Sequence, residues 1–397
     1  MRILMVSDVY FPRINGVSTS IETFRRALAA QGVEVRLVAP DYGQPEVEEG
    51  IIRVAGRPVP GDPEDRLVGW RSMHTAVRQA AINCDLIHIQ TPFVAHYAGL
   101  KAARRFDLPV VATYHTLFEE CLEHYVPFLP AGWLRAQARS WSRRQCNVLD
   151  AVIVPSSAME ARLAGYGVTQ PMEVIPTGIP LRQFEGGDRA AFRSRLGIDA
   201  ERPLALFVGR LSHEKNIGFL LEAMRHLREN CPRALLLITG EGPAMPDLQR
   251  TVQDLGVSEQ VRFLGYLDRE RDLPDCYAAA DVFAFASPNE TQGLVLIEAM
   301  AAGLPVIALS AMGTADILEP RQGALVPAGA PEEFAAAMAR IFANPQERSR
   351  LAENARDYAK LWSDSAMAAR QAALYRQLIQ SRQEGKAWKA RTKAKPA

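Results

Sequence analysis

Short apolar runs with almost no polar interruption recur along most of this chain, and helical patterns fill the intervals between them. Runs of this kind are typical of parallel strands that are covered by helices on both faces. In the first half they fall at residues 3–6, 33–39, 86–89, 110–113, 152–154 and 173–175. Because strand–helix–strand repeats form right-handed crossovers, the pattern predicts an α/β fold with a doubly wound sheet.

The alternation stops once, at residues 176–188 (PTGIPLRQFEGGD), which are rich in Pro and Gly and predict a linker. It then restarts with apolar runs at residues 204–208, 235–239, 261–264, 282–285 and 306–309. A length of 397 residues also suits two domains. We therefore predict two Rossmann-like domains, at residues 1–178 and 179–360. A helix at 361–382 is expected to pack back on the first domain, and the basic tail at 383–397 is expected to be disordered.

The composition excludes several classes of protein. A net charge of +1 gives no overall field for binding nucleic acid. The five cysteines are scattered without a C-x-x-C pair, which argues against a disulfide framework or a zinc site and favours a reducing compartment. No apolar run approaches the roughly 18 residues that cross a bilayer, and the N-terminus reads as a strand rather than a signal peptide. We expect a cytoplasmic protein.

Open α/β sheets bind ligands at the carboxyl ends of their strands, and both halves carry a glycine there. Gly16 follows the first strand, and Gly209 ends the first strand of the second half. A glycine near a helix N-terminus exposes amides to an anion, although each glycine can also simply serve a tight turn. Neither segment is a G-x-G-x-x-G or a P-loop motif, which disfavours a dinucleotide-dependent dehydrogenase or a P-loop enzyme.

Two cations lie on one loop after the first strand of the second half. Arg210 can give two parallel hydrogen bonds to a pyrophosphate, and Lys215 can add a point charge. The alternative is a solvated pair beside Glu214.

Two glutamates, Glu290 and Glu298, stand on either side of the expected start of a helix near Gly293. Their spacing corresponds to roughly 12 Å of helix rise, which suits a ligand with a sugar on one side of a diphosphate and a ribose on the other. Such spacing is common by chance, however. In the alternative, Glu298 is a surface residue and Glu290 is a partner of the helix dipole.

Taken together, GR-x4-K at residues 209–215 and E-x7-E at residues 290–298 resemble the family-4 retaining glycosyltransferases of GT-B fold. The resemblance covers nearly the whole chain, including NGV at 15–17, VIPTG at 174–178 and AAGLPV at 301–306. It implies two doubly wound domains that face each other across a cleft. The family usually has Asn where Thr177 stands, a departure that we expect to affect the hinge more than the chemistry.

The resemblance implies a nucleotide-sugar donor and a role for each matching residue. The implied catalytic residues are Arg210, Lys215, Glu290 and His115. The implied donor-binding residues are Gly16, Gly209, Arg210, Lys215, Glu290, Gly293, Leu294 and Glu298. Retention is expected to proceed by attack on the same face, without a protein nucleophile. Since the cations can take the place of a metal, no metal and no cofactor are expected. For His115 the alternative is a satisfied histidine beside a strand end.

The first half also carries a candidate acceptor and membrane region. A helical stretch at residues 130–150 combines tryptophans with arginines, a combination that indicates a membrane-surface helix. The residues expected there are Trp133, Arg135, Arg139, Trp141 and Arg143. The alternative is an ordinary surface helix, since Arg stems also cover apolar surface.

The TYHT (113–116), HY (124–125) and ETQGLV (290–295) segments resemble bacterial diacylglycerol glucosyltransferases. The expected partners are therefore UDP-glucose, a lipid acceptor and an anionic membrane surface at the inner face of the cytoplasmic membrane. Three rival functions remain open: a GDP-mannose-dependent mannosyltransferase acting on a lipid or polysaccharide, a nucleotide-sugar epimerase, and a non-catalytic nucleotide-sugar sensor.

Overall fold

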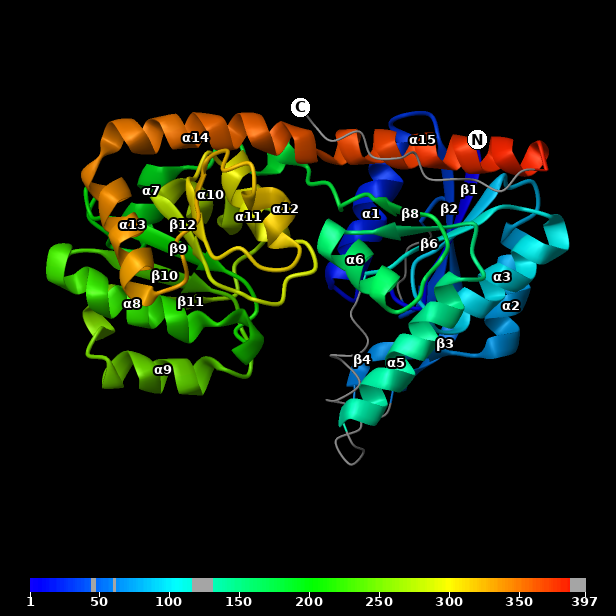
Figure 1. The fold of residues 1–397 in the computed structure, drawn as a ribbon, viewed down its shortest axis with the longest axis horizontal. Helices are drawn as coiled ribbons and strands as arrows, with labels where there is room; N and C mark the ends of the chain where they lie inside the picture. Colours follow the sequence, from blue (N-terminus) through cyan, green and yellow to red (C-terminus); the bar gives the residue numbers. More distant parts are fainter. Residues whose placement is uncertain (44–47, 60–61, 116–130, 386–397) are drawn as a thin grey trace. The chain divides into compact units, whose positions relative to one another are not determined.

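A computed structural model describes residues 1–43, 48–59, 62–115 and 131–385. The chain forms two compact units, which are labelled by element in Figure 1. The N-terminal unit comprises Met1–Gly178 together with Asp364–Ala397, and the C-terminal unit comprises Ile179–Ser363. Most of the tail predicted to be disordered lies outside the described residues, as do Cys121 and the HY segment at 124–125.

The N-terminal unit is built on an eight-stranded sheet in the order β4-β3-β2-β1-β5-β6-β7-β8. All neighbours are parallel except β3 and β4. The strands are β1 (Arg2–Val6), β2 (Glu34–Asp41), β3 (Ile51–Val59), β4 (Asp62–Val68), β5 (Leu86–Ile89), β6 (Val110–Thr113), β7 (Ala151–Val154) and β8 (Met172–Val174). The predicted parallel strands are thus present, and the prediction of a doubly wound α/β fold is confirmed.

The antiparallel hairpin of β3 and β4 was not predicted. Only Ile51 and Val54 of β3 are buried, and its other residues are partly or fully exposed. Its sequence also contains Pro58, and a proline is tolerated mainly at the edge of a sheet. A half-exposed edge hairpin therefore lacks the continuous apolar run by which the other strands were recognised.

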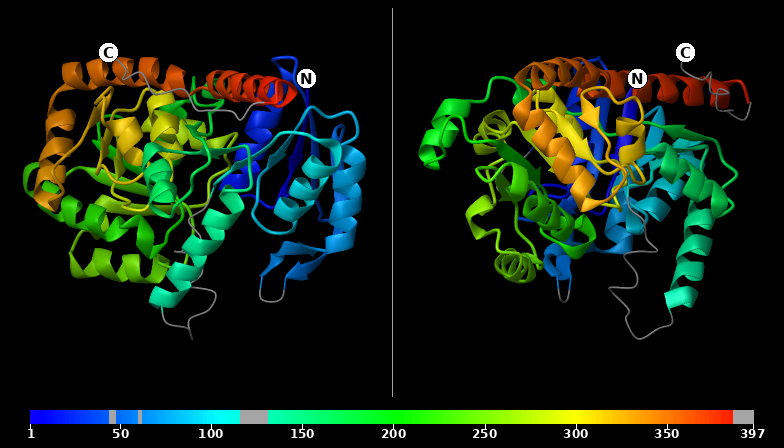
Figure 2. Two further views of the ribbon diagram at one scale, coloured as in Figure 1. Left: turned by 45° about the vertical axis from the view of Figure 1, so that its right-hand side comes forward. Right: turned by 60° about the vertical axis from the view of Figure 1, so that its left-hand side comes forward.

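Helices cover both faces of this sheet, as Figures 1 and 2 show. They are α1 (Gly16–Ala29), α2 (Trp70–Ala80), α3 (Val94–Phe106), α5 (Ala131–Cys146), α6 (Ser157–Gly165) and α15 (Asp364–Gln383). Helix α1 begins with a capping box between Asn15 and Ser18 and buries Ile21, Phe24 and Leu28. No described helix combines the length and the apolarity that a membrane span requires.

Helix α15, at the C-terminal end of the described chain, lies along α1 and completes the core of the N-terminal unit (Figure 1). The Tyr375 hydroxyl is fully buried and lies 2.6 Å from His88 Nδ1. The other ring nitrogen of His88, Nε2, lies 2.7 Å from the Thr113 hydroxyl. Both nitrogens of this buried ring are therefore hydrogen-bonded, one of them by a residue that enters the unit from the far end of the chain.

The C-terminal unit has a six-stranded parallel sheet in the order β11-β10-β9-β12-β13-β14. Its strands are β9 (Leu204–Val208), β10 (Leu235–Thr239), β11 (Val261–Gly265), β12 (Val282–Phe285), β13 (Val306–Ala308) and β14 (Ala324–Leu325). Its helices are α7 (Arg189–Arg195), α8 (Ile217–Asn230), α9 (Met245–Asp254), α10 (Asp272–Ala279), α11 (Leu294–Ala301), α12 (Thr314–Leu318), α13 (Pro331–Ala343) and α14 (Pro345–Ala359). The first strand, β9, lies in the middle of the sheet, as a doubly wound fold requires.

The two places where the chain passes between the units lie next to each other. The Ile179 amide donates to the Trp362 carbonyl at 3.0 Å, and Ile179 forms a parallel bridge with Ser363. Just before the first passage, the Thr177 hydroxyl lies 2.8 Å from the buried Ser20 hydroxyl of α1. Thr177, where the family usually has Asn, is therefore hydrogen-bonded to the N-terminal unit.

Three buried histidines make the N-terminal unit sensitive to acid. Burial lowers the pKa of His88 to about 3 and the pKa values of His96 and His115 to about 4. In the unfolded chain their pKa values return to about 6.5. Between these values the unfolded chain binds more protons than the folded one. The three histidines therefore do not change the free energy of unfolding above pH 6.5. They lower the free energy of unfolding as the pH falls toward 4.

Replacing His96 with leucine is expected to make this acid sensitivity weaker. The variant removes one of the three groups, so the dependence of unfolding free energy on pH should flatten by at most about 1.4 kcal/mol per pH unit between pH 4 and 6.5. Urea unfolding at a series of pH values measures this slope. His213→Gln is the control, because the His213 side chain is 75% exposed. Equal slopes for the wild type and His96→Leu would contradict the assignment.

Candidate active site

The loops after β9 and β10 meet backbone to backbone at the carboxyl edge of the C-terminal sheet. The Gly209 amide donates to the Thr239 carbonyl at 3.1 Å. A Cβ atom at Gly240 would lie 2.0 Å from the Gly209 carbonyl oxygen, and one at Gly242 would lie 2.3 Å from the Leu211 carbonyl oxygen. Only glycine fits at 240 and 242, so these two residues set how closely the loops approach each other.

The loop after β9 carries both predicted cations, and they differ in their partners. Lys215, at the end of a 3₁₀ turn, donates a hydrogen bond to Glu290 Oε1 and forms an ion pair with it. Glu214, the partner in the alternative interpretation, is not the residue that Lys215 pairs with. Arg210 is exposed, and within the described part of the chain its side chain has no hydrogen-bond or ion-pair partner.

The segment that begins at Glu290 is held against the start of α12. The Gly313 amide donates to the Glu290 carbonyl at 2.8 Å, and a Cβ atom at Gly313 would lie 2.1 Å from the Thr291 carbonyl oxygen. Gly293 has a φ of +88° and caps α11, whose first residue is Leu294. The first amides of a helix have no partner within it, so this turn presents donors beside the Lys215–Glu290 pair.

Glu298, the second glutamate, is buried on α11 with only 1% of its surface exposed. Its Oε1 accepts a hydrogen bond from Arg269, and its Oε2 accepts one from the Tyr277 hydroxyl at 2.9 Å. The interpretation of Glu298 as a surface residue is therefore wrong. The Glu298 carboxylate raises the pKa of Arg269, and burial together with that carboxylate raises the pKa of the Tyr277 phenol, which stays protonated.

Sequence reasoning missed both partners of Glu298. Arg269 lies on the loop after β11, and its guanidinium carbon stands 5.9 Å from the centroid of the Phe184 ring. Tyr277 is on α10 and is fully buried. Neither residue belongs to a motif. Each comes close to Glu298 only because the fold brings the loop after β11 and helix α10 next to α11.

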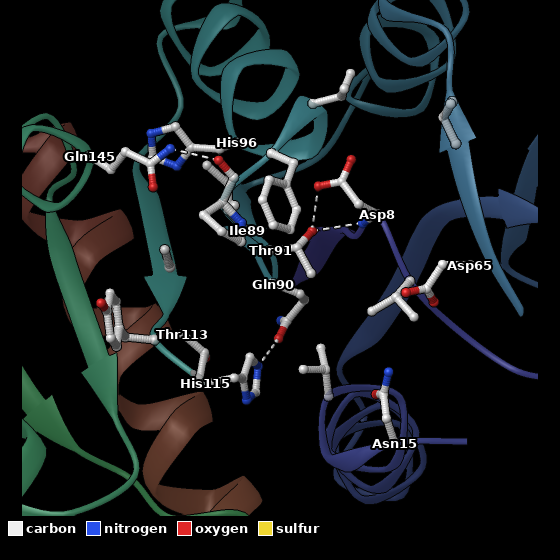
Figure 3. A pocket seen from close by; sticks show the side chains of 18 of the residues that line it. Asp8, Asn15, Asp65, Ile89, Gln90, Thr91, His96, Thr113, His115 and Gln145 are labelled. Carbon is white, nitrogen blue, oxygen red and sulfur yellow. Dashed lines mark hydrogen bonds between the residues drawn. The ribbon is translucent and has the colours of Figure 1, made fainter. Parts of the chain in front are cut away.

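Two predicted site residues, Gly16 and His115, belong to the N-terminal unit. Gly16 follows the N-cap of α1, and a Cβ atom there would meet nothing within 4 Å. Packing therefore does not require glycine at that position. The His115 ring nitrogen Nε2 lies 3.0 Å from Gln90 Oε1 (Figure 3). With its pKa at about 4 because of burial, the ring is neutral near pH 7.

A cavity of about 390 Å³ lies at the carboxyl ends of β1, β5 and β6. Figure 3 shows side chains that line it. Most of its exposed lining surface is apolar, although polar and charged residues such as Asp8, Asp65 and Arg66 also line it. Asp8 accepts hydrogen bonds from the Thr91 hydroxyl at 2.7 Å and from the Ala95 amide of α3 at 3.0 Å. Burial raises the pKa of Asp8. Together with Gln90 and His115, these groups give a largely apolar chamber a few polar contacts, which is the usual character of a small-molecule site.

Helix α5 has an exposed side that carries Arg135, Arg139 and Arg143. Trp133 is 53% exposed, whereas Trp141 is half-buried with its ring centroid 6.1 Å from that of Phe93. The Arg139 guanidinium carbon lies 5.7 Å from the centroid of the Tyr166 ring, and Arg143 packs against Gly167. Two of the arginines therefore also cover neighbouring surface of the same unit, and the role of α5 at a membrane stays a prediction.

Two family models match the chain in succession. The model described as Glycosyltransferase Family 4 matches residues 14–183, and the model described as Glycosyl transferases group 1 matches residues 188–358. An alpha-monoglucosyldiacylglycerol synthase of Streptococcus pneumoniae is 35% identical over 78% of this chain and 71% of its own length. A GDP-mannose-dependent alpha-mannosyltransferase of Mycobacterium tuberculosis is 30% identical over 83% of this chain and 84% of its own length.

Among solved structures, a sucrose-phosphate synthase from Thermosynechococcus elongatus matches with a TM-score of 0.75 at 25% identity, covering 96% of this chain and 100% of that one. Two doubly wound units of this kind define a glycosyltransferase of GT-B fold. The chain belongs to glycosyltransferase family 4 and is a hexosyltransferase, similar to the alpha-monoglucosyldiacylglycerol synthases.

Proposed function

We propose that the protein transfers glucose from UDP-glucose to a membrane lipid such as diacylglycerol, with retention of the anomeric configuration, at the inner face of the cytoplasmic membrane. The observation that carries this proposal is the Lys215–Glu290 ion pair at the carboxyl edge of the C-terminal sheet, with Arg210 exposed on the same loop as Lys215. The name of the pneumococcal relative supports the choice of sugar and acceptor.

The donor half of the proposal follows from the charges of the C-terminal unit. As the bond to the sugar breaks, negative charge develops on the diphosphate. Arg210 and Lys215 interact with that charge more strongly in the transition state than in the ground state. Fixed cations can supply this stabilisation without a metal. We therefore expect sugar transfer to continue after treatment with EDTA. Complete loss of activity with EDTA, and its recovery on adding a divalent cation, would contradict the proposal that the fixed cations act without a metal.

The two glutamates are proposed to bind different parts of the nucleotide-sugar donor. Glu290, 16% exposed in its side chain, is placed to accept hydrogen bonds from sugar hydroxyls while it stays paired with Lys215. Glu298 is proposed to accept from the ribose. Because Arg269 and Tyr277 each bond one of its oxygens, they hold the carboxylate in one orientation. The remaining lone pairs of Glu298 become available when the exposed part of Arg269 moves aside for the nucleotide.

Replacing Tyr277 with phenylalanine tests the part assigned to Glu298. The change removes one hydrogen bond to a buried carboxylate, an interaction worth about 1.5–3 kcal/mol. We expect UDP affinity to fall by roughly tenfold to a hundredfold. Isothermal titration with UDP measures it. Tyr97→Phe is the control, because Tyr97 is 41% exposed and belongs to the N-terminal unit. Unchanged UDP affinity in Tyr277→Phe would remove Glu298 from the nucleotide site.

The acceptor half rests on the apolar cavity of the N-terminal unit. A chamber of about 390 Å³ with apolar walls suits the acyl and glycerol part of a lipid better than a soluble sugar. The neutral His115 ring and the Gln90 amide can orient an acceptor hydroxyl by hydrogen bonding.

A donor and acceptor screen tests the proposal. The purified protein is incubated with UDP-glucose or GDP-mannose and a membrane lipid extract, and the products are identified by mass spectrometry. We expect a hexosyl lipid from UDP-glucose that incorporates added diacylglycerol. Nuclear magnetic resonance of the product assigns its anomeric configuration. No product with any lipid, combined with normal UDP binding, would favour the sensor over the transferase.

The second candidate function is transfer of mannose from GDP-mannose. It is favoured by the mannosyltransferase of Mycobacterium tuberculosis, whose identity to this chain is only a few per cent lower than that of the pneumococcal protein. The Arg210, Lys215 and Glu290 groups would serve either donor. The same screen separates the two, because a product formed from GDP-mannose alone would establish the second candidate.

A further inference from the structure

A chain of polar side chains crosses the core of the N-terminal unit, from α15 to the cavity at the carboxyl ends of the strands. It runs from the Gln371 amide through the Tyr375 hydroxyl and the His88 ring to the hydroxyl of Thr113. We call these four residues the polar chain. Gln371, Tyr375 and His88 are at most 1% exposed. Thr113, the last residue of β6, lines the cavity and is labelled in Figure 3.

The direction of the hydrogen bonds in the polar chain is set at the Gln371 end. Gln371 Nε2 donates to the Tyr375 oxygen, and among the described residues Gln371 Oε1 has no partner. Burial raises the pKa of the Tyr375 phenol, so the hydroxyl keeps its proton. Because the Tyr375 oxygen accepts from Gln371, its single proton lies toward His88 Nδ1, which is 2.6 Å away.

The His88 ring continues the same direction toward the cavity. Burial lowers its pKa to about 3, so near pH 7 the ring is neutral and carries one proton. With Nδ1 accepting from Tyr375, that proton is on Nε2, which donates to the Thr113 oxygen at 2.7 Å. A residue 287 positions away on α15 therefore holds the buried ring in one tautomer.

Thr113 is thereby left as a hydrogen-bond donor to the cavity. Its oxygen accepts from His88, and within the described part of the chain its own proton has no acceptor. The residue is partly exposed and lines the cavity, so this proton is available to a bound molecule. The other threonine of the lining differs, because the Thr91 hydroxyl donates to Asp8 at 2.7 Å.

We propose that the Thr113 hydroxyl determines acceptor specificity by donating to an acceptor oxygen that carries no proton, with Tyr375 and His88 as its positioning residues. The inference rests on the lipid acceptor proposed above, in which an ester carbonyl of diacylglycerol is such an oxygen. A donor on the reacting oxygen would compete for the lone pair that attacks the sugar, so a second oxygen is the better partner for Thr113. A site built around a hydrogen bond discriminates against an analogue that lacks it, here a dialkyl glycerol ether.

Transfer kinetics of the full-length protein test the role of Thr113. In Thr113→Val, KM for diacylglycerol is expected to rise roughly tenfold while kcat stays within about twofold, because the bond is present in ground and transition states alike. Thr113→Ser keeps the hydroxyl and should stay within about threefold of wild type. The wild type should also prefer diacylglycerol to the dialkyl ether by roughly tenfold, and Thr113→Val should lose that preference.

Nitrogen-15 nuclear magnetic resonance of the His88 ring tests the positioning part without any substrate. We expect the tautomer protonated at Nε2 in the wild type and in Thr113→Ser. Tyr375→Phe should populate the other tautomer and raise KM for diacylglycerol about fivefold. The control is Tyr358→Phe, which removes a hydroxyl of α14 that donates to the Asp316 carbonyl at 3.3 Å. It should leave both the His88 tautomer and KM unchanged.

Three outcomes overturn the proposal. The first is a wild-type His88 ring protonated at Nδ1. The second is an unchanged KM in Thr113→Val. The third is an equal loss in Thr113→Ser and Thr113→Val, which would show an effect of packing rather than of the hydroxyl. UDP affinity of the variants, measured in parallel, is expected to be unchanged. If the wild type formed no hexosyl lipid, the function proposed above would fail, whereas the His88 tautomer would still decide the positioning part.

Discussion

Lys215→Gln is expected to lower kcat/KM for transfer by a factor on the order of 10²–10³, the usual cost of removing one preorganised charge from a transition state. The variant removes a cation from the diphosphate side and leaves Glu290, which is 16% exposed in its side chain, without its ion-pair partner. Initial rates of sugar transfer with the donor identified by the screen measure the effect.

The controls for this prediction come from the same unit. Lys360→Gln makes the same chemical change at an exposed lysine that pairs with Asp357, and its activity should be normal. Glu290→Gln should reduce activity to a similar extent. Because the two residues form one pair, the double variant should lose much less than the product of the two single losses. Wild-type rates in Lys215→Gln, with a folded protein, would remove the site assignment.

Asp281→Ala is expected to destabilise the C-terminal unit by about 3–5 kcal/mol, because it leaves a buried guanidinium without its counter-charge. Asp281 is 5% exposed and pairs with Arg193, whose side chain is 3% exposed, at 3.1 Å. It also pairs with Arg189 at 2.9 Å and accepts a hydrogen bond from the Leu204 amide at the start of β9. One carboxylate thus ties α7 to the central strand of the sheet.

Urea unfolding, followed by circular dichroism, measures the loss for Asp281→Ala. Asp357→Ala is the control, because Asp357 is 76% exposed and pairs with Lys360 at the surface. Its unfolding midpoint should match that of the wild type. If Asp281→Ala also unfolded at the wild-type midpoint, Arg189 and Arg193 would have to be satisfied by carbonyl groups alone. Arg193 does donate to the carbonyls of Ala279, Asp199, Ala200 and Arg202.

The parallel sheets could be predicted because strands that are buried on both faces appear in the sequence as continuous apolar runs. The runs that become β5, β6, β9 and β12 are apolar at nearly every position. The β3–β4 hairpin could not be recognised in the same way, because it lies at an edge of the sheet and most residues of β3 are not buried. The short strand β14, with two residues, carries too little pattern to identify.

The candidate site was predictable where its residues sit on motifs, and it was not where packing alone brings residues together. Arg210, Lys215, Glu290 and Glu298 were found by spacing and by resemblance, but the pairing of Lys215 with Glu290 joins positions 75 residues apart. The pairing of Arg269 with Glu298 joins the loop after β11 to helix α11. Nothing in the local sequence around Arg269 indicates that it covers a buried carboxylate.

The place of α15 has a consequence for the synthesis of this protein. Helix α15, at residues 364–383, supplies Met367, Tyr375 and Leu378 to the core of the N-terminal unit. All strands of that unit come from residues 2–174. On the ribosome, the second unit can finish folding before the first has received its last helix. Until then His88 lacks the Tyr375 hydroxyl, and the part of α1 that α15 covers has no neighbour. A nascent chain stalled before residue 364 would therefore carry a folded second unit and an incomplete first unit with exposed apolar surface. Such a chain is prone to aggregate and is expected to bind chaperones.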